Sequence, residues 1–278
     1  MVAPAYPPPA PGLTRISQST LREYLRCGIA WAFRREDGNR YATVRMLIGS
    51  GVDRGAAADH EAKIHERSPL SVGDIVDVSI AGYEAEVAET EVPAARVEID
   101  QGKDETAAAA RAFAVDLSPA IVPIAAQVPM VAALPGRDVE LVGTPDLIEE
   151  IGLADLKVGR AWSQDAVDRS HQLTAYSLLH RIHFGRWPGN AARPRPGEGF
   201  VAKVRIDSIH RVRGGWQAER IWSYRTAEHV SAFLAVVDRA VAGMEAGIAL
   251  PAPEGAWWCS PAWCPFWHRC PAVGKKKE

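Results

Sequence analysis

The four cysteines of this 278-residue chain lie toward its two ends, and their placement constrains the fold more than any other feature. Cys27 stands alone near the N-terminus, whereas Cys259, Cys264 and Cys270 lie close together near the C-terminus. Three closely spaced cysteines in a chain that is not secreted are typical of a metal site. If Cys27 supplies a fourth ligand, the fold must bring the two ends of the chain together in a clasp.

Three interpretations of these cysteines stand beside one another. Four thiolates can hold a [4Fe–4S] cluster, and the tryptophans around the late cysteines would restrict the access of solvent to it. Four cysteines can also hold a structural Zn²⁺ ion, or they can be ordinary buried thiols. Disulfides are typical of secreted proteins, but the proline-rich N-terminal segment lacks the basic and apolar regions of a secretion signal, so we expect a cytoplasmic protein.

Composition favours a globular protein with no membrane partner. Hydrophobic residues make up 47% of the chain and charged residues 24%, which is ordinary for such proteins. The chain has no apolar run of the length, about eighteen residues, that spans a bilayer. We predict a single domain over residues 13–272, with a disordered leader over residues 1–12 and a solvated basic tail over residues 273–278.

Helical spacing of apolar residues predicts that the N-terminal part of the chain is mainly helical. Ser17 and its neighbours can cap a first helix that carries Cys27. Gly49 and Gly51, inside the next predicted helix, indicate close packing of its backbone or a kink. The later helices are predicted over residues 43–64, over residues 72–92 with a loop at the end, and over the alanine-rich residues 106–115.

A change of period from 3.6 to two residues predicts strands farther along the chain. Residues 139–143 and 153–158 alternate in this way, so Asp155 and Lys157 project from one face of their strand. Asp146 ends the preceding strand or lies in its turn. A hairpin can therefore bring its carboxylate close to that of Asp155. Hard divalent cations prefer oxygen ligands, and a lysine beside them can orient a water molecule. The alternative is that these charged groups form the solvated face of a half-buried sheet.

The C-terminal half continues with both helices and strands. Ser163 caps a helix on which Gln172 and Tyr176, four residues apart, share a face. The whole pattern favours the α/β class with an N-terminal helical addition. The remaining predicted elements are a strand over residues 200–206, a hairpin over residues 211–224 that turns at Gly214-Gly215, and an amphipathic helix from Thr226 to near Gly247.

Basic residues are concentrated in one stretch that contains few acidic residues, although the net charge of the chain is −2. Such a stretch is either a solvated face or a groove that follows the phosphates of a nucleic acid. Its members are Arg181, Arg186, Arg193, Arg195, Lys203, Arg205, Arg211 and Arg213.

Three motifs follow one another at short intervals: Gly143-Thr144-Pro145-Asp146, Asp155-Leu156-Lys157, and Gln172 with Tyr176. In this order they resemble the RecB-like exonuclease branch of the PD-(D/E)XK nuclease superfamily, where Gly-x-x-Asp precedes (Asp/Glu)-x-Lys and Gln-x-x-x-Tyr. The resemblance covers about residues 13–272. It implies an α/β fold with a mixed central sheet flanked by helices, an N-terminal helical region and a C-terminal cysteine-rich clasp.

The resemblance also implies a site for Mg²⁺ or Mn²⁺. The family carries Gly-x-x-x-His on an upstream helix, and here Gly49 is followed by Asp53 at the position of the histidine. Asp53 is therefore the expected ligand, and His60, two helical turns further on, is the alternative. The other expected ligands are Asp146, Asp155 and the carbonyl of Leu156.

The same resemblance implies roles in hydrolysis for the remaining motif residues. Lys157 would position or activate the attacking water, and Gln172 and Tyr176 would contact the DNA strand. The plainer alternatives are a solvated helix position for Gln172 and core packing for Tyr176. The implied activity is a DNA exonuclease of phage-type recombination or repair. It would act on single strands or duplex ends, with an annealing protein or a helicase as candidate partner. The alternative is a DNA-binding or CRISPR-adaptation accessory factor that cuts weakly or only within a complex.

The cysteine pattern resembles an iron–sulfur subset of this branch, which includes phage-type, CRISPR-associated and AddB-like exonucleases. In that subset one cysteine precedes the nuclease core and three follow it. The resemblance therefore implies that Cys27, Cys259, Cys264 and Cys270 hold a [4Fe–4S] cluster, with structural Zn²⁺ as the alternative. The gap between the first two late cysteines is wider here than is common in those families.

Overall fold

The structure is a computed structural model that describes residues 6–7, 9–38, 42–65, 68–90, 92, 94–189, 202–261 and 263–273. Its helices and strands form a mixed α/β arrangement, which confirms the predicted fold class. Residues 1–5 and 8 of the predicted leader and residues 274–278 of the predicted basic tail lie outside the described residues. None of the described helices combines the length and the apolar character needed to cross a membrane.

Helices dominate the first part of the chain and strands follow, as predicted, but an unpredicted strand, β1, precedes the first helix. The helices and helical turns are α1 Gln18–Arg26, α2 Gly28–Asp37, α3 Val44–His65, α4 Val72–Glu89, α5 Arg96–Ala112, the π-helical turn η1 Phe113–Leu117, the 3-10 turn η2 Ser118–Ala120, α6 Gln164–Asp168, α7 His171–Phe184, α8 Ala227–Glu245 and the 3-10 turn η3 Trp267–Arg269. The strands are β1 Thr14–Ser17, β2 Pro123–Ala126, β3 Met130–Ala133, β4 Val139–Gly143, β5 Leu147–Glu149, β6 Gly152–Gly159, β7 Ala202–Val212 and β8 Gly215–Arg225.

The strands form two mixed sheets. The order in the larger sheet is β2-β5-β6-β7-β8, and the order in the smaller sheet is β1-β4-β3. In the larger sheet β6 and β7 run parallel, and the other neighbouring strands run antiparallel. In the smaller sheet β1 is parallel to β4 and β3 is antiparallel to it. The parallel pair therefore lies inside the larger sheet, where strands are normally covered on both faces.

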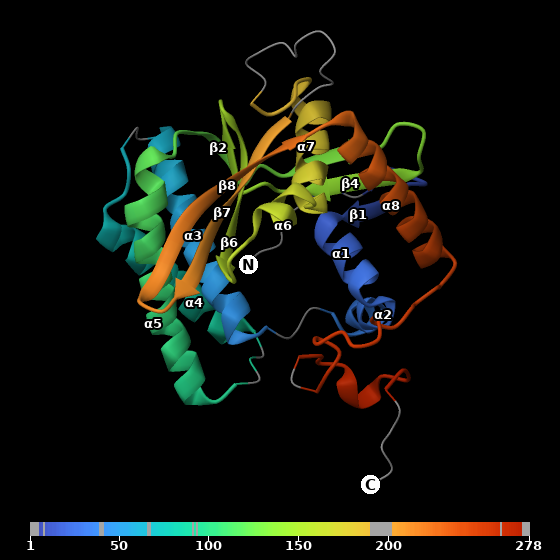
Figure 1. Ribbon diagram of the computed structural model, residues 1–278, viewed down its shortest axis with the longest axis horizontal. Coiled ribbons are helices and arrows are strands. Elements are labelled where there is room, and N and C mark those ends of the chain that lie inside the picture. The colour runs from blue at the N-terminus through green and yellow to red at the C-terminus, as the bar shows by residue number, and fades with distance from the viewer. Residues whose placement is uncertain are drawn as a thin grey trace.

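Helices cover both faces of the larger sheet (Figure 1). The helices α3, α4 and α5 lie against one face, and α7 and α8 lie on the other side. Side chains alternate along β6, since Leu153 packs in the apolar core with α7 and α8 and Ala154 packs in the core with α3, α4 and α5. The first half of this strand is buried on both faces, and Asp155, the last residue of that half, is buried with it.

Two glycines let α3 pack closely against α4. A Cβ atom on Gly51 would lie 2.8 Å from the carbonyl oxygen of Ser79, and one on Gly55 would meet the side chain of the same serine. Neither position has room for a side chain in a close-packed interior. The predicted close packing is confirmed at Gly51, whereas a Cβ atom on Gly49 would meet none of the described atoms within 4 Å.

The helix is interrupted at Cys27, so the prediction that Cys27 lies within one continuous helix is wrong. Cys27 ends α1 and caps α2, and its Sγ accepts a hydrogen bond from the backbone N–H of Ala30 at 3.5 Å. The C-terminal coil packs directly on this junction: a Cβ atom on Gly28 would lie 2.8 Å from the backbone nitrogen of Leu250. A contact between such distant segments leaves no trace in helical spacing.

Gln172 and Tyr176 were predicted to lie on a helix that Ser163 caps. They lie instead on a separate helix, α7, which begins at His171. Ser163 caps only the short α6, and Ser170 caps α7. The fully buried guanidinium of Arg225 donates to the carbonyl oxygens of Val167, at 2.6 Å, and Ser170, at 3.4 Å. Arg225 therefore holds the turn from which α7 starts.

The strands β7 and β8 form one long hairpin instead of the predicted short strand followed by a separate hairpin. They pair from Ala202 and Arg225 to Val212 and Gly215. The turn occupies residues 213–214, one residue before the predicted position. Residues 200 and 201 of the predicted strand lie outside the described residues.

Candidate active site

Asp146 and Asp155 meet across the β5–β6 hairpin. Asp146 immediately precedes β5, whose first residue, Leu147, pairs with Ala154 of β6. Oδ2 of Asp146 accepts a hydrogen bond from the backbone N–H of Leu156 at 2.6 Å. This bond ties the Asp146 carboxylate to the strand that carries Asp155, so the hairpin brings the two predicted acids together.

The buried carboxylate of Asp155 is held by two neighbours. Lys157 forms an ion pair with it, and Gln172 Nε2 donates to its Oδ1 at 2.9 Å. The same Nε2 lies 3.0 Å from the hydroxyl oxygen of Tyr176 and donates to it. Gln172 is therefore not a purely solvated helix position, and Tyr176 both packs in the core and presents its hydroxyl to the acidic cluster.

Gly143 gives Tyr176 the space that this arrangement needs. A Cβ atom on Gly143 would lie 2.8 Å from Cε1 of Tyr176 and 2.9 Å from Cδ1 of Leu179. The backbone of β4 thus contacts the ring directly. The glycine of the first motif has a packing role that its distance in sequence from Tyr176 does not reveal.

Gln127 joins two of the carboxylate-bearing segments, and nothing in the sequence predicted it. Its Nε2 donates to Oδ2 of Asp53 at 3.0 Å, and its backbone N–H donates to the carbonyl of Asp146 at 3.2 Å. Its φ is 46°, the one positive value among the described residues other than glycine. Such a conformation is uncommon outside glycine and concentrates at functional sites. A glutamine between two strands carries no signal of this in the sequence.

His60 lies beside the acidic cluster in a small cavity. It is 4% exposed, and within the described chain neither ring nitrogen has a hydrogen-bond partner. Its ring packs edge-on against Phe113, with centroids 5.8 Å apart. The cavity, of about 10 Å³, is lined by His60 together with Asp53 and Asp146, and such a volume holds about one water-sized group. Burial lowers the pKa of His60 to about 4, so its imidazole is neutral at neutral pH.

Asp53, Asp146 and Asp155 form the acidic cluster together with Lys157, and their carboxyl groups act on one another electrostatically. Burial, followed by the charge of Asp155, raises the pKa of Asp53 to about 6. Burial raises the pKa of Asp146 well above its usual value, and Asp155 and Asp53 raise it further. Burial alone would lower the pKa of Lys157, but the charges of Asp155 and Asp146 outweigh it and raise that pKa. Among the described residues of the cluster, three carboxyl groups therefore face one lysine, and their repulsion favours the protonated forms of Asp53 and Asp146 when no cation is bound.

The cluster fits a hard divalent cation in its donor chemistry. Carboxylate and carbonyl oxygens are the ligands that Mg²⁺ and Mn²⁺ prefer, and a cation would relieve the repulsion among Asp53, Asp146 and Asp155. Across the described ranges of the chain, no three His, Cys, Asp or Glu side chains converge closely enough to form a closed metal site. Together with the Leu156 carbonyl, these three acids remain candidate ligands, with His60 beside them.

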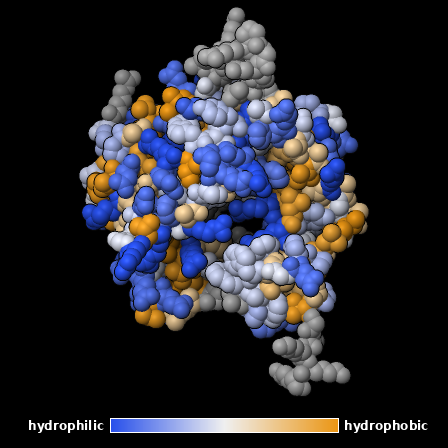
Figure 2. Space-filling model, viewed as in Figure 1, coloured by the Kyte–Doolittle hydropathy of each residue, from blue (hydrophilic) through white to orange (hydrophobic). Residues whose placement is uncertain are grey.

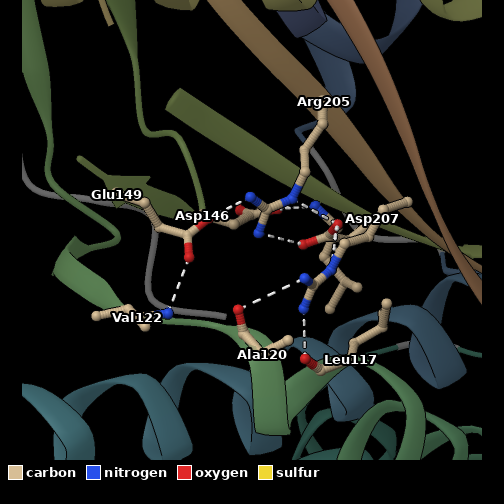
Figure 3. A network of polar contacts seen from close by, with 9 residues as sticks. Leu117, Ala120, Val122, Asp146, Glu149, Arg205 and Asp207 are labelled. Carbon is tan, nitrogen blue, oxygen red and sulfur yellow. Dashed lines mark hydrogen bonds and ion pairs between the residues drawn. The ribbon is translucent and has the colours of Figure 1, made fainter. Parts of the chain in front are cut away.

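A fully buried ion network lies next to the cluster in the β5–β6–β7 part of the sheet (Figure 3). The guanidinium of Arg205 is 0% exposed and pairs with Glu149 of β5 and with Asp207 of its own strand, whose Oδ1 is 2.7 Å from Nε. Asp207 stands opposite Leu156 in the register of β6 and β7. The network therefore fixes the position of the strand that carries Asp155.

The described members of the predicted basic stretch do not share one environment: Arg181, Arg186, Arg211 and Arg213 are exposed, whereas others are engaged by the fold. Arg205 is buried in the ion network, Arg211 pairs with Glu105, and Lys203 lies over the Trp222 ring at 4.2 Å. Arg193 and Arg195 lie outside the described residues. Burial and long-range partners, which the charge run does not encode, account for the difference.

The four cysteines are close enough to act on one another electrostatically, but within the described residues no three of them converge closely enough to hold a metal ion. All are partly buried free thiols. Burial raises the pKa of Cys259, and the nearby Cys27 and Cys270 raise it further. Burial also raises the pKa of Cys264, and the other three cysteines contribute to that shift. The C-terminal segment lies beside α1 and α2 (Figure 1), so the two ends of the fold meet.

Comparison with known proteins shows which family this chain matches. Residues 15–271 match the family model described as the PD-(D/E)XK nuclease superfamily. No curated protein matches the sequence. Among seven matching chains of solved structures is a candidate exonuclease from Eubacterium rectale, which is 14% identical, with 95% of this chain and 91% of that chain covered and a TM-score of 0.54. SSO0001 is 12% identical, with 92% and 95% covered and a TM-score of 0.31.

Proposed function

The chain belongs to the PD-(D/E)XK nuclease superfamily, and from this we propose that it is a divalent-metal-dependent deoxyribonuclease that digests DNA from its ends. The observation that carries the proposal is the electrostatic coupling of Asp53, Asp146 and Asp155 with Lys157 in one partly buried cluster. An exonuclease is favoured over an endonuclease by the motif order and by the description of the Eubacterium rectale neighbour as a candidate exonuclease. The expected products carry 5′-phosphate ends.

The proposed roles follow from the contacts of each side chain. Asp53, Asp146, Asp155 and the Leu156 carbonyl would hold Mg²⁺ or Mn²⁺. The bound metal would lower the pKa of a water molecule and neutralise charge on the phosphate. Asp146 keeps its orientation through the backbone N–H of Leu156, and Gln127 orients Asp53. These bonds hold the ligands before a cation arrives, which reduces the rearrangement that binding requires.

Lys157 would position the attacking water and stabilise charge in the transition state. Its ion pair with Asp155 keeps it protonated, in agreement with its raised pKa. Gln172 would seat the DNA strand together with Tyr176, because it links the Tyr176 hydroxyl to Asp155. A substrate that contacts the Tyr176 hydroxyl would therefore alter the hydrogen bond that Gln172 donates to Asp155.

The four cysteines would hold a structural [4Fe–4S] cluster, with Zn²⁺ as the alternative. Two observations support this proposal: the thiols influence one another's pKa values, and the Arg26 guanidinium lies 4.9 Å from the centre of the Trp258 ring, next to Cys259. Analysis of iron and acid-labile sulfide in protein purified without oxygen distinguishes these two cases. Bound zinc without iron would refute the iron–sulfur cluster but would still agree with a metal site formed by the four cysteines.

The nuclease proposal is tested by digestion of end-labelled single- and double-stranded DNA in Mg²⁺ or Mn²⁺. We expect the wild type to degrade DNA and Lys157→Ala to be inactive. The matched control is Lys103→Ala, which removes an exposed lysine that pairs with Glu84 on the helical side of the protein. Cleavage by Lys157→Ala at the wild-type rate would contradict the proposed role. A folded wild type that cuts neither substrate would instead support the accessory-factor alternative. The setting, recombination or repair with an annealing protein or helicase, belongs to the same proposal.

A further inference from the structure

A groove of about 210 Å³ opens between α1 and the start of α7, directly beside the candidate active site. Gln172, which contacts Asp155, forms part of its wall. Figure 2 shows that this face of the molecule is hollowed between the tip of β6 and α1, and hydrophilic residues surround much of the hollow. Gln172 therefore connects the groove to Asp155 of the acidic cluster.

The α1 side of the groove carries the positive charge of Arg22, with which no acid of the described residues forms an ion pair. Arg22 is exposed and lines the groove, and no ion pair or hydrogen bond engages it within the described part of the chain. Arg22 lies close enough to Lys157 and to Arg26 for its charge to oppose the protonated form of each. Arg22 and Arg26 are four residues apart, so they share one face of α1 about 6 Å apart along its axis. Neighbouring phosphates of an extended strand can match such a spacing.

The opposite wall offers an aromatic ring. Trp162, in the segment between β6 and α6, lines the groove and packs one side against the apolar core of α7 and α8. Leu21 and Leu25 of α1 line the groove as well. Proteins that bind single strands combine cationic groups along the backbone with aromatic rings on which unpaired bases stack. In a duplex the bases are already stacked and cannot reach such a ring.

We propose that this groove binds the end of a single DNA strand, with Arg22 on a phosphate next to the one at the acidic cluster and Trp162 stacked on an unpaired base. This assignment rests on the proposed nuclease function and makes single-stranded ends the preferred substrate. A duplex end would have to fray before it could enter.

The test measures binding separately from cleavage. The full chain carrying Lys157→Ala is titrated with a fluorescent single-stranded oligonucleotide, and with a blunt duplex of the same sequence, in Ca²⁺. We expect tighter binding of the single strand. Adding Arg22→Gln should weaken this binding and reduce the slope of log K against log salt by about 0.7, the value for one lost phosphate contact on a single strand. The matched control, Arg239→Gln, removes an exposed arginine on α8 and should change neither quantity.

Trp162→Ala should raise the dissociation constant for the single strand about 5- to 150-fold, the range for one lost base stack. Because Trp162 also packs against the core, the Trp162→Phe variant keeps a ring and should restore most of the affinity. Wild-type affinity and salt slope in Arg22→Gln would overturn the proposal, as would equal losses for single strand and duplex. If the wild type cleaves DNA but these variants bind it unchanged, the proposed role of the groove is refuted and the proposed nuclease function is retained.

Discussion

Replacing Gly143 with alanine tests how closely β4 and α7 must approach to shape the site. The new Cβ atom would lie 2.8 Å from Cε1 of Tyr176 and 2.9 Å from Cδ1 of Leu179, and separations this short force the ring or α7 to move. Overpacking of this kind lowers the free energy of unfolding by about 1–3 kcal/mol. Movement of Tyr176 would also displace Gln172, which holds Asp155. A misplacement of about 1 Å near reacting groups can lower the rate about 100-fold.

Urea unfolding and the cleavage rate on end-labelled DNA measure these two effects. The matched control is Gly73→Ala in the first turn of α4, where the nearest atom to a new Cβ is 3.6 Å away. Alanine is favoured over glycine inside helices by about 1 kcal/mol, so this control should keep full activity and at least wild-type stability. A Gly143→Ala protein with wild-type stability and wild-type cleavage would show that Tyr176 does not need this space.

Three further predictions follow from the buried groups. Because burial and Asp155 raise the pKa of Asp53 to about 6, the protonated group stabilises the metal-free fold, and this stabilisation is complete below about pH 4 and lost as the pH rises through 6. In calorimetry with EDTA, Asp53→Asn should remove this pH dependence, and an unchanged profile would contradict the assignment. Arg205→Met should lower the free energy of unfolding by about 3–5 kcal/mol in urea, because Glu149 and Asp207 stay buried without their partner. A smaller loss would mean that water reaches these acids. Cys264→Ser should lower both the melting temperature and the bound metal, and a protein that keeps both would rule out the clasp.

Residues whose placement depends on local periodicity were predictable from the sequence. The alternation of residues 153–158 placed Asp155 and Lys157 on one face of a strand, and the structure has them there as an ion pair. The four-residue spacing of Gln172 and Tyr176 placed them on one helix face, where they hydrogen-bond to each other. In these cases the period of the backbone alone decides which side chains meet.

Residues whose placement depends on distant partners were not predictable. The burial of Arg205 is decided by Glu149, on another strand, and a run of basic residues gives no sign of it. Gln127 reaches Asp53 from a different part of the chain, and its left-handed backbone is set by that tertiary context. Cys27 interrupts a helical pattern that continues on both sides of it, because the coil at Leu250 packs there.

The contact between Gly28 and Leu250 also orders the events of folding. The backbone N–H of Ile29 donates to the carbonyl of Leu250 at 3.3 Å, so this contact closes a loop that contains the whole acidic cluster. Contacts between such distant residues carry the largest loop-closure entropy and form slowly. The β5–β6 hairpin is local and can form early, whereas we expect the docking of the C-terminal coil on the α1–α2 junction to be completed last. We therefore expect a refolding chain to gather its carboxylates first and to gain its strand-binding wall, which α1 supplies, only in the final step.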